Sequence, residues 1–170
     1  MLPGRRRTAD EWQRAIEGLQ ELGPVCAEYG VRLAVEPLNR FETFFLNTAA
    51  DAAALIDAVD HPSIGVLYDT FHANIEEKNQ AEAIRLLGSR IIHVHTCEND
   101  RGTPCTGPID WIGVVGALHA IEYQGWCVIE TFGPAIKEIA AAACIWRDLA
   151  ARPEDIPSIG AANLRALGIR

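Results

Sequence analysis

Four residues that could bind a metal ion each follow a short apolar run in the sequence: Glu36, Asp69, His95 and Glu130. Three carboxylates and one imidazole, without a thiolate, suit a hard or borderline divalent cation better than structural zinc. Such a site keeps positions open for substrate oxygens and can stabilise a developing enolate or enediolate. The four residues therefore predict a metal site for proton transfer beside a carbonyl group, with Mn²⁺, Mg²⁺ or Co²⁺ as the candidate ions.

We expect each of these residues to end a strand of a parallel β-sheet. Apolar runs precede them, and segments with helical periodicity separate the runs. The predicted strands cover 31–35, 64–68, 91–94 and 126–129. The predicted helices cover 8–28, 49–59, 79–87, 111–121, 135–151 and 159–167. This alternation predicts an α/β fold of parallel β/α repeats, in which the carboxyl ends of the strands bring the four side chains to one mouth.

The size and charge of the chain exclude several classes of protein. Its 170 residues, 49% hydrophobic and 22% charged, are typical of one soluble globular domain. They are too few for a complete eight-stranded TIM barrel, which needs about 250 residues. A formal net charge of −8 repels the phosphates of nucleic acids and of anionic lipids. Because no long apolar stretch or signal segment is present, we expect a cytoplasmic protein without a membrane or nucleic-acid partner.

The sequence around the four residues contains longer motifs. They read VEPLNRFETFFLNT at 35–48, GVLYDTFHANIEE at 65–77, HVHTCENDRGTPCTG at 93–107 and IETFG at 129–133. Together they resemble the sugar 3-epimerases of the D-tagatose and D-psicose (allulose) type, within the xylose-isomerase-like TIM barrels. The resemblance extends over nearly the whole chain but only over the second half of that barrel. It implies one domain over 1–170 that forms half of a TIM (β/α)₈ barrel, with about four strand–helix units.

The resemblance implies a role for each matching residue. The family's metal-ligand positions are matched by Glu36, Asp69, His95 and Glu130. Its substrate-contacting positions are matched by Glu42, His72 and Arg101. Glu36 and Glu130 also match its acid/base pair. The implied reaction is epimerisation of a free ketohexose at C3, in which one glutamate removes the proton to give a cis-enediolate and the other returns a proton on the opposite face.

Three other interpretations stay open. An aldose–ketose or hydroxypyruvate-type isomerase would use the same site, with proton transfer between C1 and C2. A non-catalytic half-barrel would need a partner, although a scaffold has no need of both Glu36 and Glu130. A member of the endonuclease IV branch would need a histidine-rich multi-zinc site and a basic face. The net charge of −8 argues against a basic face.

A half-barrel leaves two strand edges unpaired, near 31–35 and 126–129, and exposes the inner face of its sheet. We therefore expect a homo-oligomer that covers these edges, with a small ketose sugar as the substrate. Other polar residues are interpreted as structural. Glu76 and Glu77 are expected at a solvated helix start, and Trp111 is expected to pack at the base of the barrel.

Overall fold

The computed structural model describes residues 2–169; Met1 and Arg170, which the expected domain 1–170 includes, lie outside the described residues. Its centre is a four-stranded parallel sheet in the order β1-β2-β3-β4. The strands are β1 (Leu33–Val35), β2 (Ile64–Asp69), β3 (Ile91–His95) and β4 (Cys127–Val128). Consecutive strands are neighbours in the sheet, and at least one helix lies between each pair along the chain. The predicted α/β fold of parallel repeats is confirmed.

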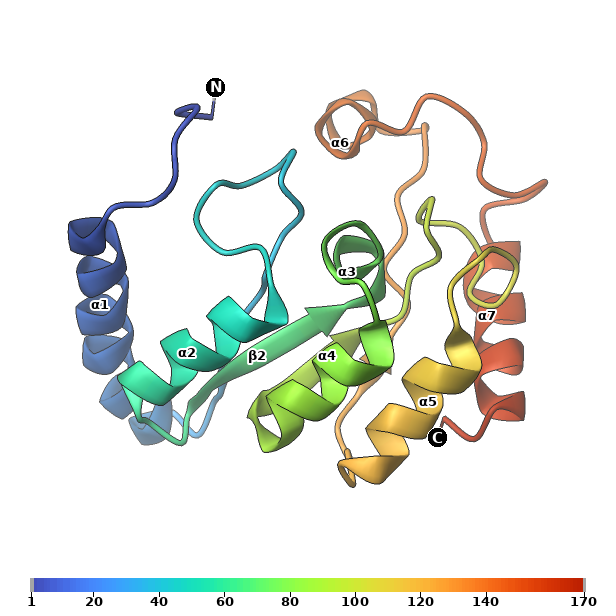
Figure 1. The fold of residues 1–170 in the computed structure, drawn as a ribbon. Helices are drawn as coiled ribbons and strands as arrows, with labels where there is room; N and C mark the ends of the chain where they lie inside the picture. Colours follow the sequence, from blue (N-terminus) through green and yellow to red (C-terminus); the bar gives the residue numbers. More distant parts are fainter. Residues whose placement is uncertain (1, 170) are drawn as a thin grey trace.

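Helices pack around this sheet, and a row of them covers one of its faces. The helices are α1 (Ala9–Glu28), α2 (Ala49–Val59), α3 (Thr70–Glu76), α4 (Gln80–Leu87), the 3₁₀ turn η1 (Gly88–Arg90), α5 (Trp111–Ala120), α6 (Lys137–Ala143) and α7 (Asp155–Ala166). Helices α1, α2, α4 and α5 form a row, and each contacts the next (Figure 1). Capping side chains mark where they begin: Thr8, Thr48, Asn79 and Asp110 each accept a hydrogen bond from a backbone N–H of the first turn.

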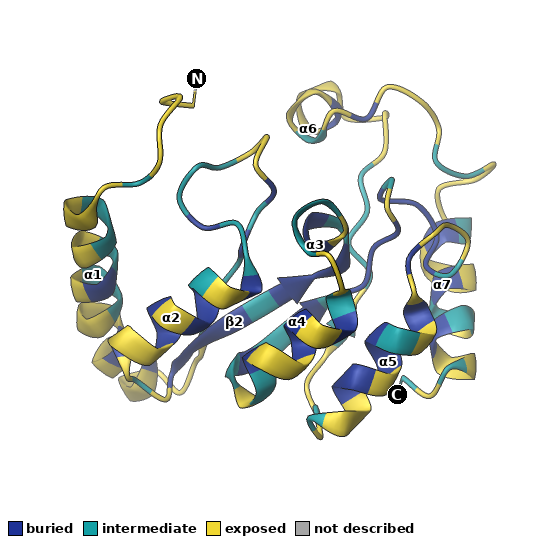
Figure 2. Cartoon of the chain, in the orientation of Figure 1, coloured by how far each residue is buried: buried dark blue, intermediate teal, exposed yellow. Residues whose placement is uncertain are grey.

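The core lies between the row of helices and the sheet. Val66 and Val94 have no exposed surface and belong to the same hydrophobic cluster as Ile84 and Leu87 of α4. Buried residues accordingly follow the sheet and the helix faces that turn toward it (Figure 2). Side chains alternate between the two faces of a strand, so the residues next to Val94 on β3 point away from this core. His95 is one of them, and the inner face therefore carries the residues with chemistry.

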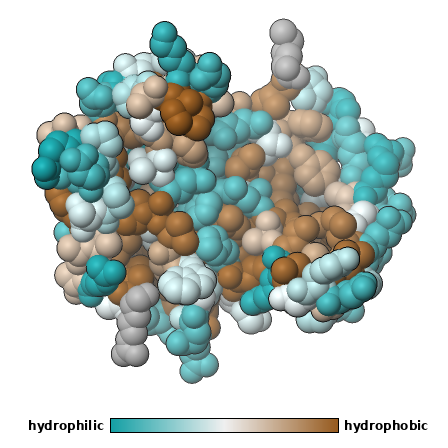
Figure 3. All heavy atoms as spheres, turned by 180° about the vertical axis from the view of Figure 1, so that it is seen from behind, coloured by the Kyte–Doolittle hydropathy of each residue, from teal (hydrophilic) through white to brown (hydrophobic). Residues whose placement is uncertain are grey.

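The two outer strands have free edges. Within residues 2–169, β1 pairs only with β2 and β4 pairs only with β3. Val31 and Trp126, which precede these strands, are both exposed. The face opposite the row of helices also shows several apolar patches (Figure 3). In the described part of the chain, no helix is long and apolar enough to span a membrane.

The predicted helix over 135–151 is wrong in its second half. Helix α6 ends at Ala143, and Cys144 adopts a left-handed conformation with φ 55° that stops it. The sequence is rich in alanine, but α6 has no side-chain cap at its start, and within it only Ala140 is buried. Because short helices depend on tertiary packing, propensity alone does not extend this one. Helix α7 begins at Asp155, earlier than predicted, and α3 is a helix that the sequence interpretation missed.

Candidate active site

The sheet brings the four strand-end residues together. One ligand atom from each of Glu36, Asp69, His95 and Glu130 lies within 4.8 Å of the others. His95 Nδ1 is 3.9 Å from Glu36 Oε1, 3.5 Å from Asp69 Oδ2 and 3.4 Å from Glu130 Oε2. We call this group the carboxylate–histidine cluster. Its members come from the carboxyl ends of all four strands, where parallel α/β folds place their sites.

Two atoms of the cluster indicate that it fits a metal ion. Glu36 Oε1 and His95 Nδ1 are buried, and neither has a hydrogen-bond partner among the described residues. An unpaired buried polar atom costs free energy, so both atoms favour a ligand that can pair with them. Oxygen and imidazole donors without a thiolate suit a divalent cation such as Mn²⁺. The donor set and its unpaired atoms are therefore compatible with a divalent cation.

Asp69 is held by bonds to both of its oxygens. Oδ1 accepts hydrogen bonds from the backbone N–H of Phe71 (2.7 Å) and His72 (3.1 Å), which caps the start of α3. Oδ2 accepts one from Arg101 Nη1 at 2.7 Å. Burial raises the pKa of Asp69, but His95, Arg101 and His72 outweigh it and hold that pKa well below the usual range. Asp69 is therefore an ionised carboxylate with a fixed orientation.

Arg101 reaches into the cluster from the loop between β3 and α5. Its Nη1 also donates to Glu130 Oε2 at 2.7 Å, and its Nη2 lies 3.0 Å from His72 Nε2. The guanidinium carbon lies 4.0 Å from the centre of the Phe71 ring, in the range of a cation–π contact. Arg101 thus places one positive charge against two of the three carboxylates.

The close approach of charged side chains in the cluster shifts the pKa values of Glu36 and His95. Burial, followed by the charges of Asp69 and Glu130, raises the pKa of Glu36 to about 7. Burial lowers the pKa of His95, but the nearby carboxylates of Asp69 and Glu130 favour its charged form, outweigh burial and raise the pKa to about 9. A carboxyl group that titrates near neutral pH is suited to general acid–base catalysis.

All three residues expected to contact substrate lie at one cleft of about 500 Å³ beside the cluster. Glu42, His72 and Arg101 line it together with Glu36 and Glu130. The rest of the wall is mainly apolar and comes from Leu38, Phe71, Phe132, Ile139, Ala142 and Ala143. The cleft therefore has a charged side and a mainly apolar side.

Several residues of this region were missed or misplaced by the sequence interpretation. Asn39 links two predicted residues, because its Nδ2 donates to Glu42 Oε1 (2.8 Å) and lies 3.0 Å from His72 Nδ1. Glu98 is buried in the loop that carries Arg101. Neither residue ends a strand or belongs to a periodic pattern, so only the folded loops reveal them. The residues of α6 that line the cleft were likewise not singled out.

Two structural expectations are corrected. Glu76 and Glu77 lie at the end of α3, not at a solvated helix start. Glu76 accepts hydrogen bonds from Arg40, and Glu77 Oε1 accepts one from the backbone N–H of Ala49 at 2.7 Å. Trp111 packs in the core as expected, but it begins α5 at the end of the β3–α5 loop and not at the base of the barrel.

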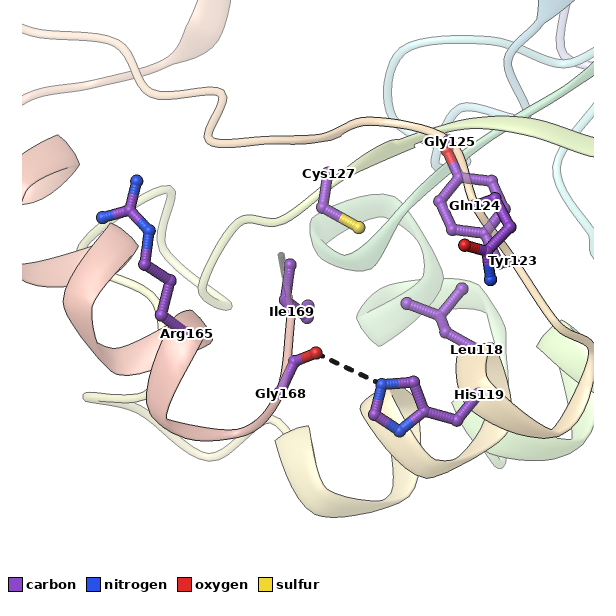
Figure 4. A pocket seen from close by; sticks show the side chains of 9 residues that line it. All are labelled: Leu118, His119, Tyr123, Gln124, Gly125, Cys127, Arg165, Gly168 and Ile169. Atoms are coloured by element: carbon purple, nitrogen blue, oxygen red, sulfur yellow. Dashed lines mark hydrogen bonds between the residues drawn. The ribbon is translucent and has the colours of Figure 1, made fainter.

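A second cavity of about 580 Å³ lies among α5, β4 and α7. Figure 4 shows His119, Tyr123, Cys127 and Arg165 around it, with His119 Nε2 3.3 Å from the carbonyl oxygen of Gly168. Although this cavity is larger than the cleft, none of the predicted site residues lines it. We therefore place the candidate active site at the cluster and its cleft.

Comparisons with known proteins agree with this fold. The sequence matches the family described as Xylose isomerase-like TIM barrel over residues 1–152. It is 43% identical to a probable ketose 3-epimerase of Synechocystis sp. over 152 residues, which is 89% of this chain and 53% of that protein. A D-psicose 3-epimerase of Ruminiclostridium cellulolyticum is 38% identical over 139 residues, 82% of this chain and 47% of that protein.

Solved structures resemble nearly the whole of this chain over somewhat more than half of their own length. A structure of L-ribulose 3-epimerase matches with a TM-score of 0.91 at 33% identity, covering 98% of this chain and 58% of that chain. A D-psicose 3-epimerase determined in the presence of D-fructose matches with a TM-score of 0.87 at 33% identity, covering 96% and 57%. The chain spans about half the length of the curated relatives it matches. With four parallel strand–helix units that correspond to half a barrel, the chain belongs to the xylose isomerase-like TIM barrel family.

Proposed function

We propose that residues 1–170 form a single domain that carries the catalytic half of a metal-dependent sugar epimerase acting at C3 of a free ketohexose. The observation that supports this most strongly is the carboxylate–histidine cluster, with four ligand atoms within 4.8 Å and two of them unpaired. Relatives named as a probable ketose 3-epimerase and a D-psicose 3-epimerase favour the same reaction class and substrate.

In this proposal the metal is held by Glu36, Asp69, His95 and Glu130. Mn²⁺ is the favoured ion, with Mg²⁺ or Co²⁺ as alternatives. A bound divalent cation supplies Lewis acidity, which stabilises negative charge on a substrate oxygen and makes the neighbouring C–H more acidic.

Glu36 and Glu130 form the proposed acid/base pair. They follow the two outer strands of the sheet, β1 and β4, and therefore approach the cleft from opposite sides. Inversion of a carbon needs one group on each face, so that one carboxylate removes the C3 proton and the other returns a proton. The carboxyl group of Glu36, whose pKa is raised to about 7, is suited to take up that proton.

The remaining cleft residues would bind and orient the sugar. Arg101 carries several planar donors for hydroxyl or carbonyl oxygens, and the Glu42 carboxylate accepts hydrogen bonds from hydroxyl groups. His72 also lines the cleft, with its Nε2 3.0 Å from Arg101 Nη2 and its Nδ1 3.0 Å from the Asn39 amide that donates to Glu42. Phe71 and Phe132 offer apolar surface for the C–H face of the ring or chain.

Exchange with solvent deuterium tests this function. The chain with Mn²⁺ is incubated with D-fructose or D-psicose in D₂O, and the recovered sugar is examined by NMR. Deuterium at C3 with formation of the C3 epimer is expected, and deuterium confined to C1 or C2 would favour an aldose–ketose isomerase instead. Glu130→Gln should abolish turnover, whereas Glu154→Gln, an exposed carboxylate far from the cluster in sequence, should not. Equal turnover in Glu130→Gln and wild type would refute the acid/base assignment.

We also propose that a second copy of the chain covers the free edges of β1 and β4. Both strands are parallel to the rest of the sheet and lack an outer partner within the described residues, and Trp126 is exposed beside β4. Light scattering at micromolar concentration should then give a dimer or larger species, and a clean monomer would contradict this.

We further propose a reducing, cytoplasmic location. All five cysteines are free thiols, which supports this proposal.

A further inference from the structure

We infer that Glu98 is a positioning residue that holds Arg101 at the cleft. The effect of Glu98 on turnover rests on the proposed function. Glu98 is only 1% exposed, and it belongs neither to the carboxylate–histidine cluster nor to the cleft lining. Its Oε1 accepts hydrogen bonds from Trp111 Nε1 (2.6 Å) and from the backbone N–H of Cys105 (3.1 Å). Its Oε2 accepts one from the backbone N–H of Asn99 (3.1 Å).

These three donors come from widely separated points of the β3–α5 loop. Asn99 lies near its start, Cys105 in its middle and Trp111 at the first residue of α5. Within residues 2–169, Glu98 forms no ion pair, so N–H groups alone offset the cost of burying its carboxylate. The Glu98 carboxylate therefore connects the start, the middle and the end of the loop through hydrogen bonds.

Gly107 gives independent support for this arrangement. A Cβ atom added there would collide with Oε2 of Glu98 and would lie 2.6 Å from Oδ1 of Asn99. A side chain at position 107 would therefore require the buried Glu98 carboxylate to shift from its present place. The loop packs directly against this carboxylate at Gly107.

The β3–α5 loop, held by Glu98, determines the position of Arg101. The carbonyl oxygen of Glu98 accepts a hydrogen bond from the backbone N–H of Arg101 at 3.0 Å. Arg101 has φ 67°, a conformation that non-glycine residues rarely adopt and that the surrounding structure must hold. From this backbone the guanidinium reaches Asp69 and Glu130 at 2.7 Å each. Loss of the Glu98 carboxylate should therefore release the Arg101 side chain from the cleft.

The ¹H–¹⁵N spectrum of the arginine side chains tests this without requiring activity. A guanidinium held by fixed partners gives separate Nη signals, whereas a mobile one gives merged signals; Arg101→Lys assigns those of Arg101. We expect separate signals in wild type, broadened signals in Glu98→Gln, which keeps one acceptor oxygen, and merged signals in Glu98→Ala. The control is Glu77→Gln. Glu77 lies outside the loop, at the end of α3, and also accepts a backbone N–H, that of Ala49 at the start of α2. The Arg101 signals of this variant should stay separate.

Folded Glu98→Ala protein with unchanged Arg101 signals would overturn the proposal. If Glu98→Ala does not fold, Glu98→Gln and Trp111→Phe, which removes one donor, decide it by the same criterion. In the epimerisation assay, Glu98→Gln should raise KM by about tenfold with a smaller change in kcat, as expected for one weakened charge-assisted hydrogen bond to substrate. Absence of turnover in wild type would count against the proposed function alone, since the spectra still report on Arg101.

Discussion

Replacing Arg101 with methionine should destabilise the metal-free chain and strengthen its binding of Mn²⁺. The guanidinium lies 2.7 Å from both Asp69 Oδ2 and Glu130 Oε2, and the Arg101 and Asp69 side chains are 6% and 0% exposed. Removing one partner of such a buried pair costs about 3–5 kcal/mol, because the other charge is left uncompensated. Methionine keeps an apolar stem beside Phe71, so the main change is the loss of positive charge. We expect the free energy of unfolding to fall by this amount.

The effect on metal binding has the opposite sign. Two unit charges 4 Å apart interact by about 4 kcal/mol at an effective dielectric constant of about 20. An energy of this size corresponds to nearly a thousandfold in affinity, and relaxation of the site and of Mn²⁺ hydration reduces it, so removal of the Arg101 charge should tighten Mn²⁺ binding by at least about tenfold. Because a ligand bound only to the folded state stabilises it, each tenfold gain in affinity reduces the destabilisation at saturating Mn²⁺ by about 1.4 kcal/mol.

Urea unfolding in EDTA and in Mn²⁺, with calorimetric titration of Mn²⁺, measures both effects. Arg40→Met is the matched control, since Arg40 pairs with Glu76 outside the cluster and its side chain is 61% exposed. This control should lose no more than about 1 kcal/mol and keep the wild-type affinity for Mn²⁺. Affinity in Arg101→Met that equals or falls below wild type would refute the reasoning, because Arg101 would then not compete with the metal.

Three further predictions concern stability. Without metal, the free energy of unfolding should fall from about pH 5 to 9, because the folded-state pKa values of Glu36 (about 7) and His95 (about 9) lie above their unfolded values, and the stability they contribute at low pH is lost as they deprotonate. Urea titrations across this range check it, and an unchanged slope in Glu36→Gln would contradict the assignment. Leu87→Ala should cost about 2–5 kcal/mol, because Leu87 is fully buried; a loss below about 1 kcal/mol would argue against this packing. Thr8→Ala should lower the melting temperature by the equivalent of about 1 kcal/mol, because it removes the capping box of α1; an unchanged melting temperature would show that the cap is dispensable.

The order of elements could be predicted because each signal is local. Strands such as β2 are apolar runs that end at a polar residue, and Thr48 and Asn79 begin helices through their own side chains. The carboxylate–histidine cluster could be predicted for the same reason, since the direction of parallel strands already determines which residues meet. Local sequence and sheet topology were sufficient for both.

The parts that could not be predicted depend on contacts between distant segments. Helix α6 ends at Ala143 although the sequence beyond it favours a helix, because too few of its residues find a core. Glu98 looks like an ordinary loop carboxylate until Trp111 is brought beside it. The contact of Arg101 with Asp69 likewise depends on a left-handed backbone residue that has no signature in sequence.

The carboxyl group of Asp69 couples the cluster to a helix. Its Oδ1 holds the first turn of α3 through the amides of Phe71 and His72, while Oδ2 faces the cluster. A ligand that immobilises Oδ2 also limits rotation of the whole carboxyl group. Binding of a ligand to the cluster should therefore stabilise the first turn of α3, and an ordered first turn should favour binding of the ligand. Amide hydrogen exchange at the start of α3 should therefore slow when metal binds. Phe71 and His72 also line the cleft. Linkage therefore requires that any cleft ligand that orders α3 binds the metal-loaded protein more tightly than the metal-free protein.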